Sequence, residues 1–178
     1  MSSKAASRYA KSLIDLSTEQ NSLEEMKNDM VLFEQVVDNN SELEAILKNP
    51  IVPLDKKSGI LNEVFGSKVH QITQSFLKLV VNKGRAGILF ETSKQFIHQY
   101  NLIKGIVTAE VTSAIALTDD NRKEIVSLVQ KELGANEVVV KEKVDEKLIG
   151  GFVLKVGDKQ FDASIASGLN KLKREFAL

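Results

Sequence analysis

The stretch QFIHQYNLIKGIVTAEVTS, residues 95–113, contains the point at which the apolar pattern of the chain changes. Before Gly105, apolar residues recur at helical spacing, and Phe96 and Tyr100 are two of them. From Ile106 to Thr112, apolar and polar residues alternate, which is typical of a half-buried strand. The change of period therefore predicts a helical domain before this point and a mixed domain after it.

The helical domain is predicted to span residues 1–104 as a bundle of six helices, because short polar or Pro/Gly breaks separate its amphipathic segments. Ser41 is expected to open the third helix as part of a capping box, and Ser67 is expected to cap the fifth. A hydroxyl at such a position accepts a hydrogen bond from a backbone N–H that has no partner within the helix.

The second domain is predicted to span residues 105–178 as a small β-α-β-β-β-α unit. Its expected elements are strands at 106–112, 137–144, 152–156 and 160–163, a helix at 118–133, and a final helix that carries Ile165, Leu169, Leu172 and Phe176. The chain as a whole is therefore assigned to the α+β class, with an N-terminal six-helix bundle followed by this domain.

The glycine-rich segment of the second domain raises the question of a phosphate-binding loop. Such a loop needs the spacing Gly-x-x-x-x-Gly-Lys-Ser/Thr. Here five residues separate Gly151 from Gly157, and Asp158 follows where it would repel phosphate. The segment instead predicts two turns around a strand. Asp162 and Ser164 then lie before and at the cap of the final helix.

Composition excludes several classes of protein. Lys plus Arg and Asp plus Glu number 24 each, so no overall basic field favours nucleic acid as a partner. The chain has no cysteine, which excludes disulfides and thiolate metal sites. No apolar run approaches the about 20 residues of a membrane-spanning helix, and the N-terminus lacks the apolar core of a signal peptide. We expect a soluble, unexported protein that can still dock on a membrane complex.

Residue types that carry chemistry are present but isolated. His70 and His98 belong to different predicted helices and lack further ligands at metal-binding spacing. Asp119 and Asp120 suit the acidic first turn of a helix, and Lys83-Gly84-Arg85 suits a turn between helices better than an anion site. We therefore predict no catalytic, cofactor or metal site. An enzyme that uses the glycine-rich segment remains an alternative, which nucleotide titration would distinguish.

Apolar surface on short helices is the remaining candidate for function. Small residues such as Ala6 and Ala10, near Tyr9 and Phe76, suggest a groove between the first and fifth helices that is wide enough for a partner's amphipathic helix. The alternative is that every apolar stripe faces the core of the bundle, and periodicity alone favours that alternative.

Five motifs in this order connect the chain to a known family. They are RYAKSLIDLS from Arg8, LKNPIVPLDKKSGILNEVF from Leu47, SFLKLVVNKGRAGIL from Ser75, VTAEVTSAIALTD from Val107, and DEKLIGGFVLKVGDKQFDASIASGLNKLK from Asp145. Together they resemble the delta subunit of the rotary proton-translocating ATP synthase, the bacterial counterpart of the oligomycin-sensitivity-conferring protein. The resemblance covers nearly the whole chain.

The resemblance implies a non-catalytic stator subunit without cofactors. In that family the helical bundle receives the N-terminal helix of an alpha subunit, and the C-terminal domain joins the b subunits of the peripheral stalk, so that proton flow is coupled to ATP synthesis. The implied location is peripheral, at the cytoplasmic face of the cell inner membrane. The implied groove residues are Tyr9, Ala10, Leu13, Phe76, Leu79 and Val80. A cytosolic helix-binding adaptor unrelated to the synthase remains the alternative.

Overall fold

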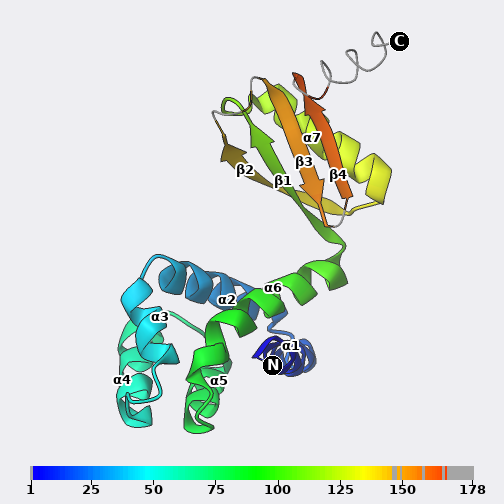
Figure 1. Cartoon of the computed structure of the whole chain (residues 1–178). Coiled ribbons are helices and arrows are strands. Elements are labelled where there is room, and N and C mark those ends of the chain that lie inside the picture. Colours follow the sequence, from blue (N-terminus) through cyan, green and yellow to red (C-terminus); the bar gives the residue numbers. More distant parts are fainter. Residues whose placement is uncertain (1, 146–147, 149, 158, 166, 168–178) are drawn as a thin grey trace, which may run out of the picture. The chain divides into compact units, whose positions relative to one another are not determined.

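The computed structural model describes the chain except for residues 1, 146–147, 149, 158, 166 and 168–178 (Figure 1). The chain divides into two compact units, one that ends at Tyr100 and one that begins at Asn101. Helices come first along the chain, and a sheet with one helix follows. The predicted α+β class is therefore confirmed.

Six α-helices precede the sheet, as the apolar periodicity predicted. They are α1 (Ser2–Glu19), α2 (Leu23–Asp38), α3 (Ser41–Lys48), α4 (Leu54–Phe65), α5 (Gln71–Asn82) and α6 (Leu89–Lys104), with a short 3₁₀ helix, η1 (Ala86–Ile88), before α6. The rings of Phe33 and Phe65 form part of the core, with centroids 5.0 Å apart. Burial of these apolar faces stabilises helices that are too short to persist alone.

Two helix starts differ from the prediction. Ser41 is the first residue of α3, and Asn40 is its cap, with Oδ1 accepting from the backbone N–H of Leu43 at 3.1 Å. Ser67 lies in a turn after α4, and the cap of α5 is His70, whose Nδ1 accepts from a backbone N–H at 3.3 Å. The predicted capping roles of Ser41 and Ser67 were therefore wrong. In each case another side chain with an acceptor atom stands at the first non-helical position.

The second unit is a four-stranded sheet with one described helix. Its elements are β1 (Ile106–Ser113), α7 (Asp119–Leu133), β2 (Glu137–Val144), β3 (Gly151–Val156) and β4 (Lys159–Ser164). The strand order is β2-β1-β3-β4, in which β1 and β2 are parallel and the other pairs are antiparallel. The predicted β-α-β-β-β order is confirmed. The final predicted helix lies largely outside the described residues.

Helix α7 connects the parallel pair of strands and covers one face of the sheet (Figure 1). Ile125 and Val129 of α7 are buried against Val111 of β1 and Leu154 of β3. Thr118 caps α7 by accepting from the N–H of Asn121, and the acidic pair that follows forms the first turn, as predicted. The small core of this unit therefore lies between α7 and the sheet.

The glycine-rich segment forms a hairpin and no phosphate loop. Gly151 opens β3 with φ +77°, and a Cβ there would lie 2.3 Å from the carbonyl oxygen of Ala163 on β4. Only glycine tolerates this close approach in a left-handed conformation. Val156 of β3 pairs with Lys159 of β4, and Gly157 lies in the turn that follows β3. The predicted strand and the turn at Gly157 that follows it are confirmed, whereas the segment before Gly150 lies largely outside the described residues.

Ser164 caps the segment that follows β4, as predicted. Its Oγ accepts from the N–H of Ser167 at 3.2 Å, and the hydroxyl of Ser167 donates to Asp162 at 2.6 Å. Hydrogen bonds from the Ser167 hydroxyl, and then from Ser164, hold the pKa of the Asp162 carboxyl below its ordinary value.

A candidate helix-binding groove between α1 and α5

A groove of about 490 Å³ lies between the C-terminal part of α1 and the exposed face of α5. We call it the α1–α5 groove and define it by its lining residues, which are Leu16, Gln20, His70, Gln71, Ile72, Ser75, Phe76 and Leu79. All of them belong to the first compact unit. The groove is therefore a property of the helical bundle alone.

Helical spacing determines which side chains of α5 reach the groove. Ile72, Phe76 and Leu79 are four and three residues apart, so they share one face of the helix. Leu77 and Val80 lie in the bundle core with 4% and 0% of their surfaces exposed. α5 thus carries apolar side chains on two faces, and the bundle buries one of them and covers the other only in part.

Two of the apolar side chains that line the groove are exposed to solvent. Leu79 is 50% exposed and Leu16 is 39% exposed. Large apolar side chains that meet in a concave surface mark a binding site more often than scattered ones do, because covering them removes apolar area from water. This surface suits an apolar partner.

A buried carboxylate anchors the start of α5, which forms one wall of the groove. Asp29 of α2 is 8% exposed, and its Oδ2 accepts from the backbone N–H of His70 at 2.8 Å and from the hydroxyl of Thr73 at 2.5 Å. Because both donors belong to the first turn of α5 or its cap, the contact holds the helix in place against α2. The groove wall is therefore pre-organised.

The other end of the groove is closed by an aromatic pair. Tyr9 of α1 meets Phe76 edge-on, with ring centroids 6.3 Å apart. Arg85, which follows α5, donates from Nη1 to the Tyr9 hydroxyl at 3.2 Å and lies 5.9 Å from the ring centroid. Leu16 of α1 and Gln20, which follows α1, line the groove together with residues of α5, and Tyr9 contacts Phe76 near the middle of α5.

The groove lining carries little charge. Among the residues that the structure describes, it contains no Asp, Glu, Lys or Arg, and His70 is its one titratable member. Gln20, Gln71 and Ser75 supply neutral hydrogen-bonding groups beside the apolar side chains. An amphipathic helix binds such a surface by its apolar stripe, in the helix-in-groove mode of recognition.

The structure divides the six predicted groove residues into three groups. Phe76 and Leu79 line the groove, and Tyr9 contacts Phe76 at its edge. The remaining three are core residues: Ala10, Leu13 and Val80 are 0%, 2% and 0% exposed. They support the groove from beneath and offer almost no surface to a partner. Whether the groove binds a helix stays a prediction.

Two apolar lining residues were not among the six. Leu16 lies seven residues after Tyr9, and Ile72 lies four residues before Phe76. These are helical spacings, so extending the two stripes along α1 and α5 would have found both. The polar lining residues carry no comparable pattern in the sequence, because a glutamine or serine on a helix surface is common whatever it faces.

A second hollow, of about 570 Å³, lies between α4 and α5. Its lining includes Asp55, Ser58, Asn62, Gln74 and Lys78. Charged and polar groups of this kind are well solvated, so covering them with an apolar helix carries a desolvation cost. The α1–α5 groove is therefore the better candidate for helix binding, although it is the smaller of the two.

Neither a metal centre nor a membrane span is found in the parts of the chain that the structure describes. No three His, Cys, Asp or Glu residues there come together in a group that could hold a metal ion. Across those same parts, every helix falls short of the length and apolar character that crossing a bilayer requires.

The fold and the groove define a two-unit α+β protein with an apolar groove on its helical bundle. The family described as ATP synthase delta (OSCP) subunit matches residues 5–176. The chain belongs to this family. It is accordingly a non-catalytic stator subunit of an ATP synthase and a peripheral part of that complex. This settles the choice against an enzyme and against an unrelated adaptor.

Individual relatives support the same assignment. The ATP synthase subunit delta of Cytophaga hutchinsonii is 43% identical, over 97% of this chain and 94% of the relative. That of Christiangramia forsetii is 37% identical, over 97% and 92%. A chain of the Toxoplasma gondii mitochondrial ATP synthase hexamer has the same fold, with a TM-score of 0.75 over 97% of both chains at 20% identity.

Proposed function

We propose that the α1–α5 groove receives the N-terminal helix of an alpha subunit, and that the second unit binds the b subunits of the peripheral stalk. The protein then links the catalytic head to the stalk at the cytoplasmic face of the cell membrane. The observation that carries the first half is the apolar lining of the groove, in which Leu16 and Leu79 are exposed to solvent and Ile72 and Phe76 are half-buried.

The dimensions of the groove support a helical occupant. Ile72 and Leu79 are seven residues apart, so the apolar row on α5 extends over about 10 Å at 1.5 Å per residue. An occupying helix with apolar residues at positions i, i+3 or i+4, and i+7 presents a stripe of the same length. Two turns of such a helix fill the groove.

The mechanical role follows from binding at both ends. Rotation of the central shaft exerts a torque on the catalytic head, and an untethered head would turn with the shaft. Proton flow would then proceed without ATP synthesis. A tether that withstands turnover needs interfaces of roughly 1,200–2,000 Å² at each end, as stable protein complexes have. The groove therefore accounts for part of one interface, and neighbouring surface must contribute the rest.

Binding of the alpha subunit is tested with the full-length chain and a peptide of the first 20 or so residues of the same organism's alpha subunit, the length of a short helix. The chain contains no tryptophan, so a single tryptophan in the peptide reports binding without background. We expect Leu79→Asp to weaken binding at least about tenfold, because the complex would bury an unpaired carboxylate. Phe76→Asp should act in the same direction.

Ile51→Asp is the matched control. Ile51 is 85% exposed and lies between α3 and α4, outside the groove lining, so the same chemical change there should leave the affinity unchanged. Circular dichroism of each variant shows whether the bundle is still folded. A peptide that does not bind, or that binds wild type and Leu79→Asp equally, would count against the groove.

The tether as a whole is tested on membranes. Membranes depleted of the protein should regain coupled ATP synthesis when wild type is added back, and should regain much less with Leu79→Asp. Pull-down of the protein from solubilised membranes should recover alpha and b subunits together. Undiminished coupling in depleted membranes would contradict the proposal, and so would a pull-down that recovers the alpha but not the b subunits.

A further inference from the structure

Arg85 lies at the Tyr9 end of the groove and is exposed, with a neutral hydrogen-bonding partner. Its guanidinium donates one hydrogen bond to the Tyr9 hydroxyl and lies over the Tyr9 ring. No ion pair to Arg85 occurs within the described residues. A guanidinium has five N–H donors in a planar fork, so most of its hydrogen-bonding capacity is not used by the chain itself.

The contact with Tyr9 restricts where this charge can lie. The hydrogen bond of 3.2 Å to the Tyr9 hydroxyl, and the distance of 5.9 Å from Cζ of Arg85 to the ring centroid, place the guanidinium beside a ring that contacts Phe76 of the groove lining. Less conformational entropy is then lost when Arg85 meets a partner than for a freely rotating surface arginine.

The uncharged lining of the groove increases the influence of the Arg85 charge on an occupant. Because the described lining has no Asp, Glu, Lys or Arg, the guanidinium of Arg85, held by Tyr9, is a charge that the aromatic end of the groove presents to an occupant. Apolar contacts alone do not distinguish one amphipathic helix from another. A positive group at one end adds electrostatic complementarity, which selects the partner and its direction in the groove.

We propose that Arg85 is a specificity-determining residue of the α1–α5 groove, and that it pairs with a carboxylate at one end of the apolar stripe of the occupying helix. This inference rests on the proposed helix-binding function. The carboxylate lies over the Tyr9 end, so the helix binds in one direction, with its apolar residues running from Tyr9 toward Leu16 and Ile72.

The experiment is a double-mutant cycle with the full-length chain. One partner is wild type or Arg85→Gln, which removes the charge and keeps donors for the Tyr9 hydroxyl. The other is the alpha-subunit N-terminal peptide or a version in which its acidic residues are replaced by their amides. The four dissociation constants are measured at about 50 mM and about 500 mM salt, because screening weakens a charge pair at the rim.

We expect each single change to weaken binding about three- to tenfold at low salt, and the double change to weaken it little further. The loss should shrink at high salt. If Arg85 only supported the bundle through Tyr9, Arg85→Gln would weaken both peptides equally, and that result would overturn the proposal. Thermal unfolding of Arg85→Gln provides an independent measure of any structural loss.

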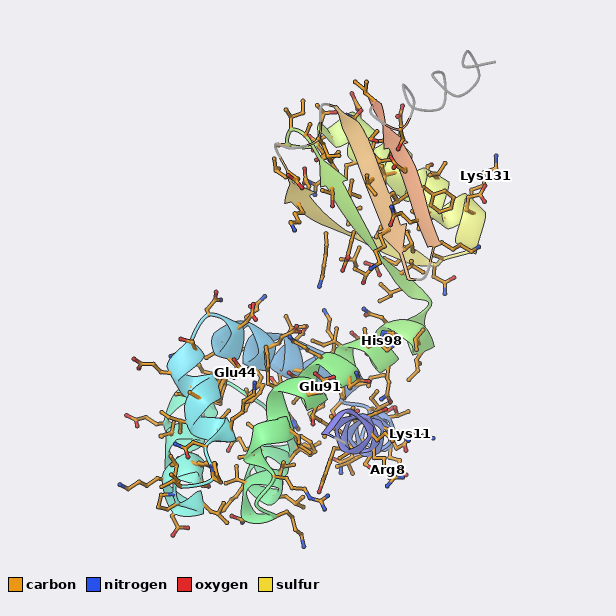
Figure 2. All side chains as sticks on the ribbon, in the orientation of Figure 1. Arg8, Lys11, Glu44, Glu91, His98 and Lys131 are labelled. Atoms are coloured by element: carbon orange, nitrogen blue, oxygen red, sulfur yellow. The ribbon has the colours of Figure 1, made fainter. Side chains whose placement is uncertain are left out.

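Lys11→Gln serves as the control for a general charge effect. Lys11 lies on the side of α1 that is turned away from α5 (Figure 2), about 200° around the helix from Tyr9. Its substitution should leave both affinities unchanged. If wild type binds the acidic and amide peptides equally, the proposed pairing of Arg85 is contradicted, while helix binding by the groove is still supported. If neither peptide binds, both helix binding by the groove and the pairing of Arg85 are contradicted.

Discussion

Replacement of Asp29 by alanine should destabilise the bundle and loosen the wall of the groove. The substitution removes the acceptor of two hydrogen bonds, from the backbone N–H of His70 and from the hydroxyl of Thr73. Thr73 is 0% exposed, so its hydroxyl cannot turn to water, and its one other contact is the weakly accepting sulfur of Met26 at 3.1 Å. His70 is exposed, so its N–H can be hydrated again.

The expected loss of stability follows from what happens to each of the two donors. A hydrogen bond to a charged group contributes about 1.5–3 kcal/mol, and a buried donor left without a partner costs about 1–3 kcal/mol. Since one donor regains water and the other does not, we expect Asp29→Ala to lower the free energy of unfolding by about 2–4 kcal/mol. Asp29→Asn keeps an acceptor oxygen and should cost less. Asp38→Ala, at an exposed position of the same helix, should change stability by less than about 0.5 kcal/mol.

Urea denaturation of the full-length chain, followed by circular dichroism at helical wavelengths, measures these changes. Hydrogen exchange of the amides of residues 66–80 reports the local effect, because the first turn of α5 should exchange faster once its anchor is lost. Gln71 and Ile72 of that turn line the groove, so peptide affinity should fall as well. A stability for Asp29→Ala within 0.5 kcal/mol of wild type, roughly the size of an ordinary surface change, would refute the reasoning.

Three further substitutions test other parts of the fold. Gly151→Ala should be at least twice as destabilising in calorimetry as Gly134→Ala. Both glycines have positive φ, but only at Gly151 would a Cβ meet backbone atoms. Equal losses of stability would contradict this. Lys57→Met should lower stability by about 1–3 kcal/mol, because the buried ammonium donates to two carbonyls at the end of α3; an unchanged melting temperature would contradict this. Ser167→Ala should raise the pKa of Asp162 toward its ordinary value of about 3.8 in an NMR titration. Because the pKa of Asp162 is lowered in the folded protein, its ionised carboxylate stabilises the fold above the ordinary pKa of the group, and this stabilisation is lost as the pH falls through the lowered pKa. An unchanged titration of Asp162 in Ser167→Ala would show that Ser167 is not the cause of the lowered pKa.

The sequence by itself determined the α+β class and the order of the described elements. The change of period at Gly105 and the turn chemistry around Gly151 and Gly157 are local properties, because a side chain's place on a helix or strand depends on its neighbours in the chain. The resemblance of five motifs to one family likewise needed no coordinates, and the family was confirmed.

Only the tertiary structure decided which apolar residues form a surface. Ala10, Leu13 and Val80 lie on apolar stripes as regular as those of Phe76 and Leu79, yet the first three are buried in the core. Periodicity identifies the apolar face of a helix but not how much of that face the neighbouring helices cover, because coverage depends on where those helices lie.

The anchor of α5 shows the same limit for polar contacts. Asp29 reaches His70 across 41 residues and Thr73 across 44, and nothing near any of the three in the chain indicates the pairing. Likewise, Arg85 follows α5 but contacts Tyr9 near the other end of the domain's sequence. Contacts between distant segments arise only when the bundle packs, so the groove, the Asp29 anchor of α5 and the contact between Arg85 and Tyr9 are properties of the folded protein.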